Sequence, residues 1–210
     1  MKAGRRVVVI GSGAAGLAAA LAAASRGADV IVLEQDDFVG GTTAISGGIV
    51  WAPAHPWISG DRAEDALAYL RELATGDVDD DLMATFTTDA SRVMVELTER
   101  TSLRWQVLPD WPDYHCELPH GLPGGRSIWP QSLRVPEVVA RQVRRPLEHT
   151  YGNADRPADD RVVLGGPVRG HTLVAGLFVA LVELGVEVRT GARVTGLLTD
   201  RAGVAGLVVG

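Results

Sequence analysis

A glycine pattern near the start of the chain constrains the fold more than any other feature. The β-branched run at residues 6–10 leads directly into residues 11–16, GSGAAG, which follow the order G-x-G-x-x-G. The run is typical of a strand buried on both faces of a parallel sheet. After it, Gly11 permits a tight turn, Gly13 lets the backbone approach a pyrophosphate, and Gly16 lets the next helix pack on the strand. The pattern predicts the first strand, turn and helix of a dinucleotide-binding unit.

The segment after the glycines supplies the other parts of such a unit. Residues 14–25 are rich in alanine and favour a helix whose N-terminal amides suit a phosphate, and Gly27 suits its end. A second strand is expected at residues 30–33, and it ends on Glu34, where dinucleotide sites place the carboxylate that accepts hydrogen bonds from a ribose. The alternative is a glycine turn that only packs a helix on a sheet. That alternative gives Glu34 no reason to stand at the strand end.

A second glycine-rich segment, GGTTAISGG at residues 40–48, indicates which dinucleotide binds. It offers many backbone N–H groups and three hydroxyls without bulky side chains, so a flat ring system can lie against the main chain. A flexible linker is the alternative. Trp51 and Pro53 directly after the segment favour an anchored loop instead.

The run GGTTAISGGIVWAP resembles the flavin loop of the 3-ketosteroid Δ1-dehydrogenases, part of the larger group of flavoproteins that includes fumarate reductase. The spacing of its glycine pairs and Trp51-x-Pro53 fit the steroid branch better than the fumarate branch. The resemblance implies FAD held without a covalent bond. It implies phosphate contacts at Gly11, Gly13, Ala14, Ala15 and Gly16, a ribose contact at Glu34, flavin contacts at Gly41, Thr42, Thr43, Ser46, Gly47 and Gly48, and an adenine contact through the backbone of Val194; Ser12 and Gln35 complete the expected cofactor-binding set.

These motifs predict an α/β fold, a Rossmann-like FAD-binding domain with a parallel sheet, inserted helices and a C-terminal β-hairpin. We expect residues 1–53 to hold the dinucleotide motif and flavin loop, residues 54–160 a helical insertion and an aromatic loop, and residues 161–210 the return to the FAD domain. The resemblance covers essentially all 210 residues but only the N-terminal part of the family's flavin domain. The substrate domain and the last flavin segment are expected in a missing C-terminal segment or a second chain, so turnover by this chain alone is doubtful.

Hydrophobic spacing and turn residues predict the remaining elements. A capping box at Asp61-x-x-Glu64 is expected to start the first inserted helix. Further helices are expected at residues 61–75, 80–100, 137–145 and 172–184, and further strands at residues 103–108, 162–164, 186–190, 193–200 and 204–209. Residues 109–130, rich in proline, glycine and aromatic residues, are expected to form a long ordered loop.

Tyr114 is the candidate catalytic residue. The segment Trp111-Pro112-Asp113-Tyr114, followed by Gly125-Arg126, matches the steroid dehydrogenases a second time. In that family flavin N5 takes a hydride from C1 of the steroid, a tyrosine pair removes the C2 proton, and a further tyrosine with a backbone N–H polarises the C3 carbonyl. A free phenol with a pKa of about 10 is a poor base at neutral pH, so as a base Tyr114 needs a partner or an electrostatic field that lowers its pKa. The alternative is a tyrosine with a purely structural role.

Composition excludes several other classes of function. A net charge of −6 argues against a nucleic-acid binder. The single cysteine, Cys116, allows no internal disulfide and fits a reducing, cytoplasmic compartment, and the five scattered histidines predict no metal site. Lys2, Arg5 and Arg6 before an alanine-rich run imitate a secretory signal, but cleavage there would remove the phosphate loop. No segment is apolar enough over the length needed to span a bilayer.

The leading hypothesis is therefore part of an FAD-dependent dehydrogenase that acts on CH–CH groups. It would introduce a double bond beside the ketone of a 3-ketosteroid-like small molecule and pass electrons to an external acceptor. Two alternatives remain open from the sequence. One is a fumarate reductase-like flavoprotein or a steroid 4-dehydrogenase, and the other is a non-catalytic FAD-binding remnant.

Overall fold

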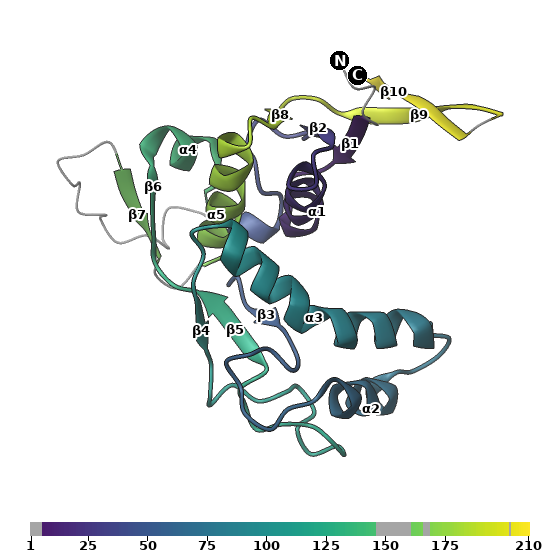
Figure 1. The fold of residues 1–210 in the computed structure, drawn as a ribbon, viewed down its shortest axis with the longest axis vertical. Helices are drawn as coiled ribbons and strands as arrows, with labels where there is room; N and C mark the ends of the chain where they lie inside the picture. Colours follow the sequence, from purple (N-terminus) through teal and green to yellow (C-terminus); the bar gives the residue numbers. More distant parts are fainter. Residues whose placement is uncertain (1–5, 146–160, 166–168, 202) are drawn as a thin grey trace. The chain divides into compact units, whose positions relative to one another are not determined.

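The computed structural model describes residues 6–145, 161–165, 169–201 and 203–210 (Figure 1). The chain divides into two units. Unit 1 consists of Met1–Gly48 and Ser132–Gly210, and unit 2 is the intervening segment Ile49–Gln131. The polypeptide therefore leaves unit 1 directly after the second glycine-rich segment.

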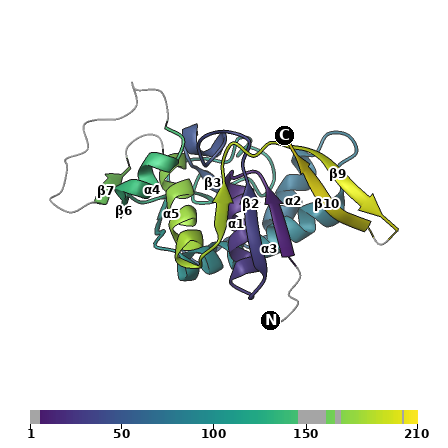
Figure 2. The ribbon, with the colours of Figure 1, turned by 90° about the horizontal axis from the view of Figure 1, so that it is seen from above.

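Unit 1 is built on a parallel sheet with strand order β1-β2-β8. The strands are β1 (Arg6–Ile10), β2 (Asp29–Leu33) and β8 (Glu187–Arg189). Helix α1 (Ala14–Ala24) connects β1 to β2, and α5 (Gly170–Glu183) leads into β8. The two helices pack against each other, and Figure 2 shows them beneath the row of strands. The predicted α/β fold with a parallel sheet is confirmed.

Strand β1 is less buried than the sequence predicts. Its side chains alternate between half-buried and exposed, and Val8 and Ile10 are 38% and 55% exposed. In β2, by contrast, Val32 is fully buried. The difference follows from packing as well as from sheet order. In the described part of the chain, Ala192, Val194 and Leu207 pack against Ile31 and Leu33 of β2, and β2 has a strand on each side whereas β1 pairs only with β2. The expectation of burial on both faces is therefore wrong for β1.

The core of unit 1 lies where α1 and α5 meet. Leu17 and Leu21 of α1 are buried, and so is every residue of α5 from 170 to 178. A helix that is apolar all round is stable only when it is surrounded by protein, which is the position of α5 here. None of the helices in the described ranges combines the length and apolar content needed to cross a bilayer.

The other described elements of unit 1 are two helical segments and two pairs of antiparallel strands. They are η1 (Thr43–Ile45), β6 (Leu133–Pro136), α4 (Glu137–Gln142), β7 (Arg161–Leu164), β9 (Val194–Asp200) and β10 (Gly203–Val209). Strand β6 pairs antiparallel with β7, and β9 with β10. At the root of the β9–β10 hairpin, Val194 and Leu207 pack against a small cluster of Ile31, Leu33 and Ala192. The predicted C-terminal hairpin is thus present and attached to β2.

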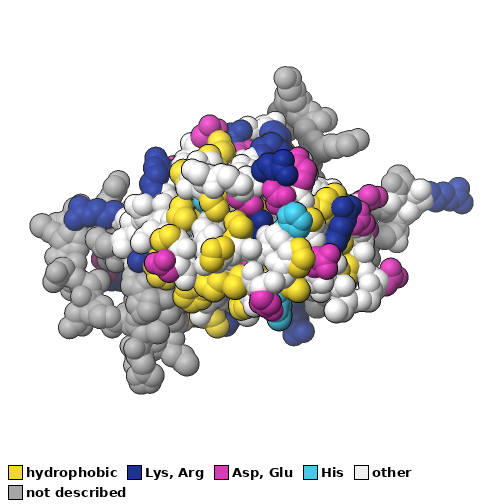
Figure 3. Space-filling model, turned by 90° about the horizontal axis from the view of Figure 1, so that it is seen from below, with side chains coloured by type: hydrophobic (Ala, Val, Ile, Leu, Met, Phe, Trp, Pro, Cys, Tyr) yellow, Lys and Arg dark blue, Asp and Glu magenta, His cyan; other side chains and the backbone are white. Residues whose placement is uncertain are grey.

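Unit 2 combines two helices with a small antiparallel sheet. Its elements are β3 (Val50–Trp51), α2 (Ala63–Leu73), α3 (Asp80–Arg100), β4 (Trp105–Val107) and β5 (Ser127–Pro130), with strand order β3-β5-β4. Helices α2 and α3 pack against each other. The molecular face in Figure 3 mixes apolar side chains with acidic, basic and histidine side chains.

The two inserted helices begin differently from one another. Asp79 caps α3 by accepting a hydrogen bond from Leu82 N at 3.1 Å. The capping box predicted for α2 is wrong, because its N-cap is Arg62 and no side chain caps it. Asp61 is instead drawn into the interior, where its carboxylate binds Arg126.

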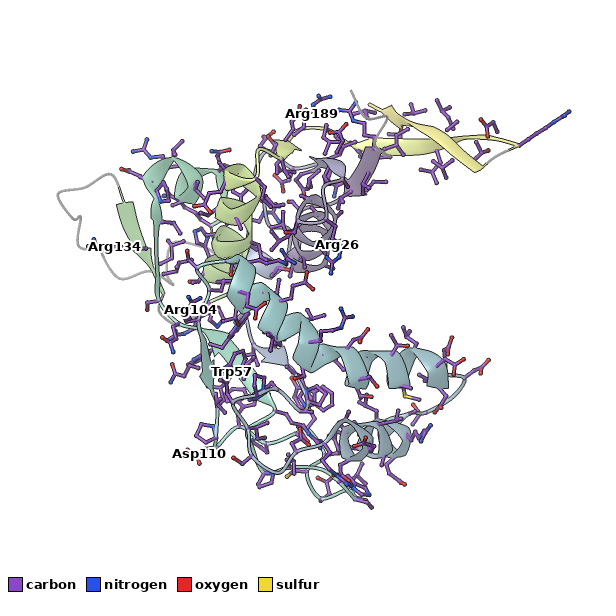
Figure 4. The ribbon with its side chains drawn as sticks, viewed as in Figure 1. Arg26, Trp57, Arg104, Asp110, Arg134 and Arg189 are labelled. Carbon is purple, nitrogen blue, oxygen red and sulfur yellow. The ribbon has the colours of Figure 1, made fainter. Side chains whose placement is uncertain are left out.

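The buried ring of His55 is expected to make the stability of unit 2 depend on pH. The ring is 1% exposed, its Nδ1 accepts from Trp57 N at 3.1 Å, and its Nε2 lies 2.8 Å from Gly125 O, so the neutral ring fits (Figure 4 labels Trp57). Burial lowers the pKa of His55 below the ordinary 6.5, although the Gly125 carbonyl and Asp61 oppose the shift. Protons therefore bind the unfolded state first as the pH falls.

We expect the unfolding free energy of unit 2 to be level above pH 6.5 and to decline as the pH falls below that value. All five tryptophans lie in unit 2, so urea unfolding followed by tryptophan fluorescence between about pH 8 and pH 5 measures it. His55→Asn, which cannot titrate, should lose this decline. An equal decline in the variant would show that another group is responsible.

Candidate functional site

The turn after β1 needs two of its glycines for reasons within the chain. Gly11 has a φ of +94° and donates from its N–H to Leu33 O at 2.7 Å, which ties the turn to the end of β2. A Cβ on Gly16 would lie 2.0 Å from Gly11 O, so α1 can approach the turn only without a side chain there. Gly13 differs, since its Cβ would meet only Thr43 Oγ1 at 3.5 Å among the described residues. The space in front of Gly13 is therefore left open.

The first turn of α1 faces the same open space. Its leading amides have no partner within the helix, and only Ala14 N–H donates to a described side chain, Thr43 Oγ1 at 3.2 Å. The first intrahelical bond runs from Leu17 N to Gly13 O at 3.0 Å. No acidic residue stands in this turn, so the positive end of the helix dipole is not neutralised. This arrangement suits a phosphate.

Glu34 is a buried acceptor at the end of β2. Only 5% of it is exposed, and its Oε2 accepts from Ser12 N at 2.9 Å and from Ser12 Oγ at 2.5 Å. Its Oε1 accepts from Asp36 N at 2.9 Å. Its own N–H donates to the carbonyl of Arg189, labelled in Figure 4. Burial works against ionisation, but the hydrogen bonds, first that of the Ser12 side chain, prevail and lower the pKa of Glu34.

The second glycine-rich segment folds back onto the phosphate turn. Gly40 N donates to Ser12 Oγ at 2.8 Å, and the Cβ position of Gly41 lies 4.0 Å from Gly13 Cα. Residues 43–45 form the short helix η1. The predicted contacts Gly41, Thr42 and Thr43 therefore lie beside the predicted phosphate contacts.

The second half of this segment lies against the start of α5. Gly48 has a φ of +69°, and its Cβ would lie 2.4 Å from the backbone of Arg169 and Gly170. Gly170 N donates to Ser46 O at 3.1 Å. A Cβ on Gly170 would lie 1.9 Å from Thr43 O, so this glycine shapes the loop as much as those within it. The sequence offers only a weak signal for it, a glycine directly before an apolar run.

An open hollow of about 350 Å³ lies next to Glu34 and is lined by Gln35, Asp36, Asp37 and Arg193. Gln35 was expected at the cofactor, and Arg193 directly precedes the predicted adenine contact Val194. The hollow thus connects the end of β2 with the start of β9. Sequence reasoning missed Asp36, Asp37 and Arg193, because polar residues in a loop carry no local pattern.

The candidate catalytic residue lies in unit 2, on the loop after β4. Tyr114 is 99% exposed, whereas Asp113 beside it is 5% exposed and Arg126 is 1% exposed. Arg126 Nη1 donates to Asp113 Oδ2 at 2.8 Å, and Arg126 Nη2 donates to Asp61 Oδ1 at 2.8 Å. The side chain of Tyr114 is therefore exposed to solvent, whereas the loop that carries it is held by the buried ion pairs of Arg126 with Asp113 and Asp61.

The family of the chain follows from its match to a known domain. Residues 6–210 match the model of the FAD binding domain family. The chain belongs to this family of FAD binding domains. Its cofactor is accordingly FAD.

Two named relatives are similar to this chain in sequence. The 4-oxocyclohexanecarboxylate 2-dehydrogenase of Sinomonas cyclohexanicum is 34% identical over 206 residues, which cover 89% of this chain and 36% of the relative. The 3-oxosteroid 1-dehydrogenase of Mycobacterium tuberculosis is 36% identical over 150 residues, 70% of this chain and 26% of the relative. The FAD binding domain described here therefore spans well under half the length of these relatives.

A solved structure agrees with the sequence relatives. The 3-ketosteroid Δ1-dehydrogenase from Sterolibacterium denitrificans, in complex with 1,4-androstadiene-3,17-dione, superposes with a TM-score of 0.83 at 26% identity. The match covers 96% of this chain and 43% of that chain. The predicted resemblance to the 3-ketosteroid dehydrogenases and their flavoprotein superfamily is confirmed.

The residues of this FAD binding domain fit the cofactor on the geometry of unit 1 alone. Gly13 leaves the backbone uncovered, the start of α1 offers amides, and Glu34 holds an ionised carboxylate beside both. These groups suit a pyrophosphate and a ribose. The individual cofactor contacts remain predictions, as does the catalytic role of Tyr114.

Proposed function

We propose that the protein is an FAD-dependent dehydrogenase that forms a ring C=C bond next to a ketone, with Tyr114 as the group that accepts the proton. The observation that carries the proposal is the phenol of Tyr114, which an ordered loop of an FAD binding domain leaves accessible to a substrate and to the partner group that a phenol needs as a base. The names of two relatives, one for a 3-oxosteroid and one for 4-oxocyclohexanecarboxylate, support a cyclic ketone as substrate. We infer a 3-ketosteroid-like substrate and an external electron acceptor.

The proposed chemistry divides between cofactor and protein. FAD, when bound, supplies the acceptor for a hydride from the carbon one bond further from the ketone. Tyr114 acts as the base once its phenol has passed its own proton to a partner group, so that the phenolate oxygen takes the proton from the carbon next to the ketone. The electron pair of that C–H bond forms the new double bond. Gly13 and the start of α1 would hold the pyrophosphate, and Glu34 the ribose. The external acceptor would finally take up the two electrons that the substrate has given up with the hydride.

The proposal predicts that Tyr114→Phe in the complete protein lowers the rate constant of flavin reduction by the ketone by about 10²- to 10⁴-fold, the usual contribution of a positioned acid or base. FAD binding should not change, because Tyr114 is not among the residues proposed to hold the cofactor. The measurement is anaerobic bleaching of the flavin absorbance by 4-androstene-3,17-dione and, in parallel, by 4-oxocyclohexanecarboxylate.

Comparing the rates of flavin reduction by the two substrates distinguishes an enzyme for steroids from an enzyme for monocyclic ketones. Turnover of fumarate with the reduced protein, unaffected by Tyr114→Phe, would place the protein in the fumarate-type chemistry instead. FAD binding with neither reaction would leave a cofactor-binding remnant. Either result contradicts the proposed dehydrogenase.

A further inference from the structure

Tyr114 is almost fully exposed, yet the residue before it is held in place by three hydrogen bonds. The Asp113 carboxylate accepts from Trp51 Nε1 at 2.7 Å, from Leu122 N at 2.9 Å and from Arg126 Nη1 at 2.8 Å. These donors come from β3, from the far end of the loop and from the residue before β5. Asp113 is therefore fixed from three directions.

The residue after Tyr114 is fixed as well. His115 N donates to the hydroxyl of Tyr69 in α2 at 3.2 Å. The loop also closes tightly on itself, because Asp113 N donates to Leu122 O at 3.0 Å. A Cβ on Gly121 would lie 2.8 Å from His115 O. The exposure of Tyr114 thus belongs to a side chain that projects from an ordered loop.

Arg126 connects this loop to a second carboxylate. Its guanidinium donates to Asp61 through Nε and Nη2 and to Asp113 through Nη1, and all three side chains are at most 2% exposed. The cluster carries one positive and two negative charges. Backbone N–H groups help to stabilise the excess negative charge. Ala54 N, for example, donates to Asp61 Oδ2 at 2.8 Å.

The cluster also holds two unusual backbone conformations. Ala54 and His120 have φ values of +53° and +64°, and they are the non-glycine residues with positive φ in the described ranges. Each gives a backbone group to the cluster, Ala54 its N–H to Asp61 and His120 its carbonyl to Arg126 Nη1 at 3.1 Å. Such conformations cost free energy and persist where surrounding contacts impose them. Here the contacts that impose them are hydrogen bonds to Asp61 and Arg126, and Arg126 in turn holds the loop that carries Tyr114 through Asp113.

We propose that Asp113, fixed by Arg126 and Trp51, is the positioning residue for Tyr114. The inference rests on the proposed function, in which the phenol takes the proton. A proton-transfer group must lie within hydrogen-bond reach of its target, and a displacement of about 1 Å can cost about 10²-fold in rate. A buried ion pair adds little net stability compared with apolar packing. The Arg126 guanidinium, however, bonds Asp113 and Asp61 at the same time through directional, charged hydrogen bonds. That is the property a positioning residue requires.

The test compares two variants of the complete enzyme that each lose one indole hydrogen bond. Trp51→Phe removes the donor to Asp113 Oδ1, and Trp105→Phe removes the bond from Trp105 Nε1 to Thr98 Oγ1 at 3.0 Å, away from the loop. With the ketone substrate that the parent enzyme turns over, we expect Trp51→Phe to lower kcat by about tenfold to a hundredfold without a change in KM. Trp105→Phe should leave kcat unchanged.

A second variant covers the case in which Trp51→Phe does not fold. Tyr69→Phe keeps the ring and removes only the oxygen that accepts from His115 N, so it should lower kcat in the same way. Hydrogen exchange at His115 and Leu122 should rise in the loop variants and not in Trp105→Phe. Equal kcat in the loop variants and Trp105→Phe, together with an inactive Tyr114→Phe, overturns this inference alone. An active Tyr114→Phe overturns the proposed function itself.

Discussion

Gly16→Ala is expected to weaken FAD binding at least tenfold and to destabilise unit 1 by about 1–3 kcal/mol. The added Cβ would lie 2.0 Å from Gly11 O and 3.1 Å from Gly11 C, both backbone atoms that cannot rotate away. Helix α1 must therefore move off the turn, and its leading amides lose their alignment with the pyrophosphate. Fluorescence titration of free FAD measures the affinity, and far-UV circular dichroism during urea unfolding measures the stability.

A matched glycine controls for the substitution itself. Gly196 in β9 meets only Val208 side-chain atoms at 3.9 Å, an ordinary contact, so Gly196→Ala should bind FAD like the parent. Binding of equal strength in Gly16→Ala would mean that the cofactor does not use the start of α1. The phosphate assignment would then fail.

Arg126→Met is expected to lower the unfolding free energy of unit 2 by about 3–5 kcal/mol, because it leaves two buried carboxylates without their cation. Arg126→Lys should lose less than Arg126→Met because it keeps a positive charge between the carboxylates. It should still lose some stability, since one ammonium cannot bond Asp61 and Asp113 with the geometry of a guanidinium. Tryptophan fluorescence during urea unfolding reports unit 2 alone.

The control is an arginine of the same unit on the surface. The Arg62 side chain is 68% exposed and pairs with Asp65, so Arg62→Met should cost at most about 1 kcal/mol. If the two methionine variants were equally stable, the buried cluster would not be a structural anchor. The positioning role inferred for Asp113 would lose its physical basis.

Much of unit 1 could be predicted because its signals are local. The strand, glycine turn, alanine-rich helix and terminal acid follow each other within residues 6–34, and each appears where expected. The later helices and the terminal hairpin also appear, with ends that differ by a few residues. Burial of β1 could not be predicted from its composition, because it depends on which distant segments pack on the faces of the sheet and which strands flank it.

The cluster in unit 2 could not be predicted for a related reason. Arg126 pairs with Asp61 across 65 residues and with Asp113 across 13, and no periodic pattern connects such positions. Asp61 also matches a capping box, a local signal that its pairing with Arg126 overrides. Only the resemblance to the steroid dehydrogenases singled out Arg126 and Asp113 in the sequence.

The hydroxyl of Ser12 accepts from Gly40 N and donates to Glu34, so one small side chain joins the three segments predicted to contact the diphosphate, the ribose and the isoalloxazine ring. If those contacts hold, affinity for the whole cofactor is expected to be non-additive over the three segments. A substitution in any one of them would then weaken the other two, and truncated nucleotides would underestimate the affinity of the intact cofactor.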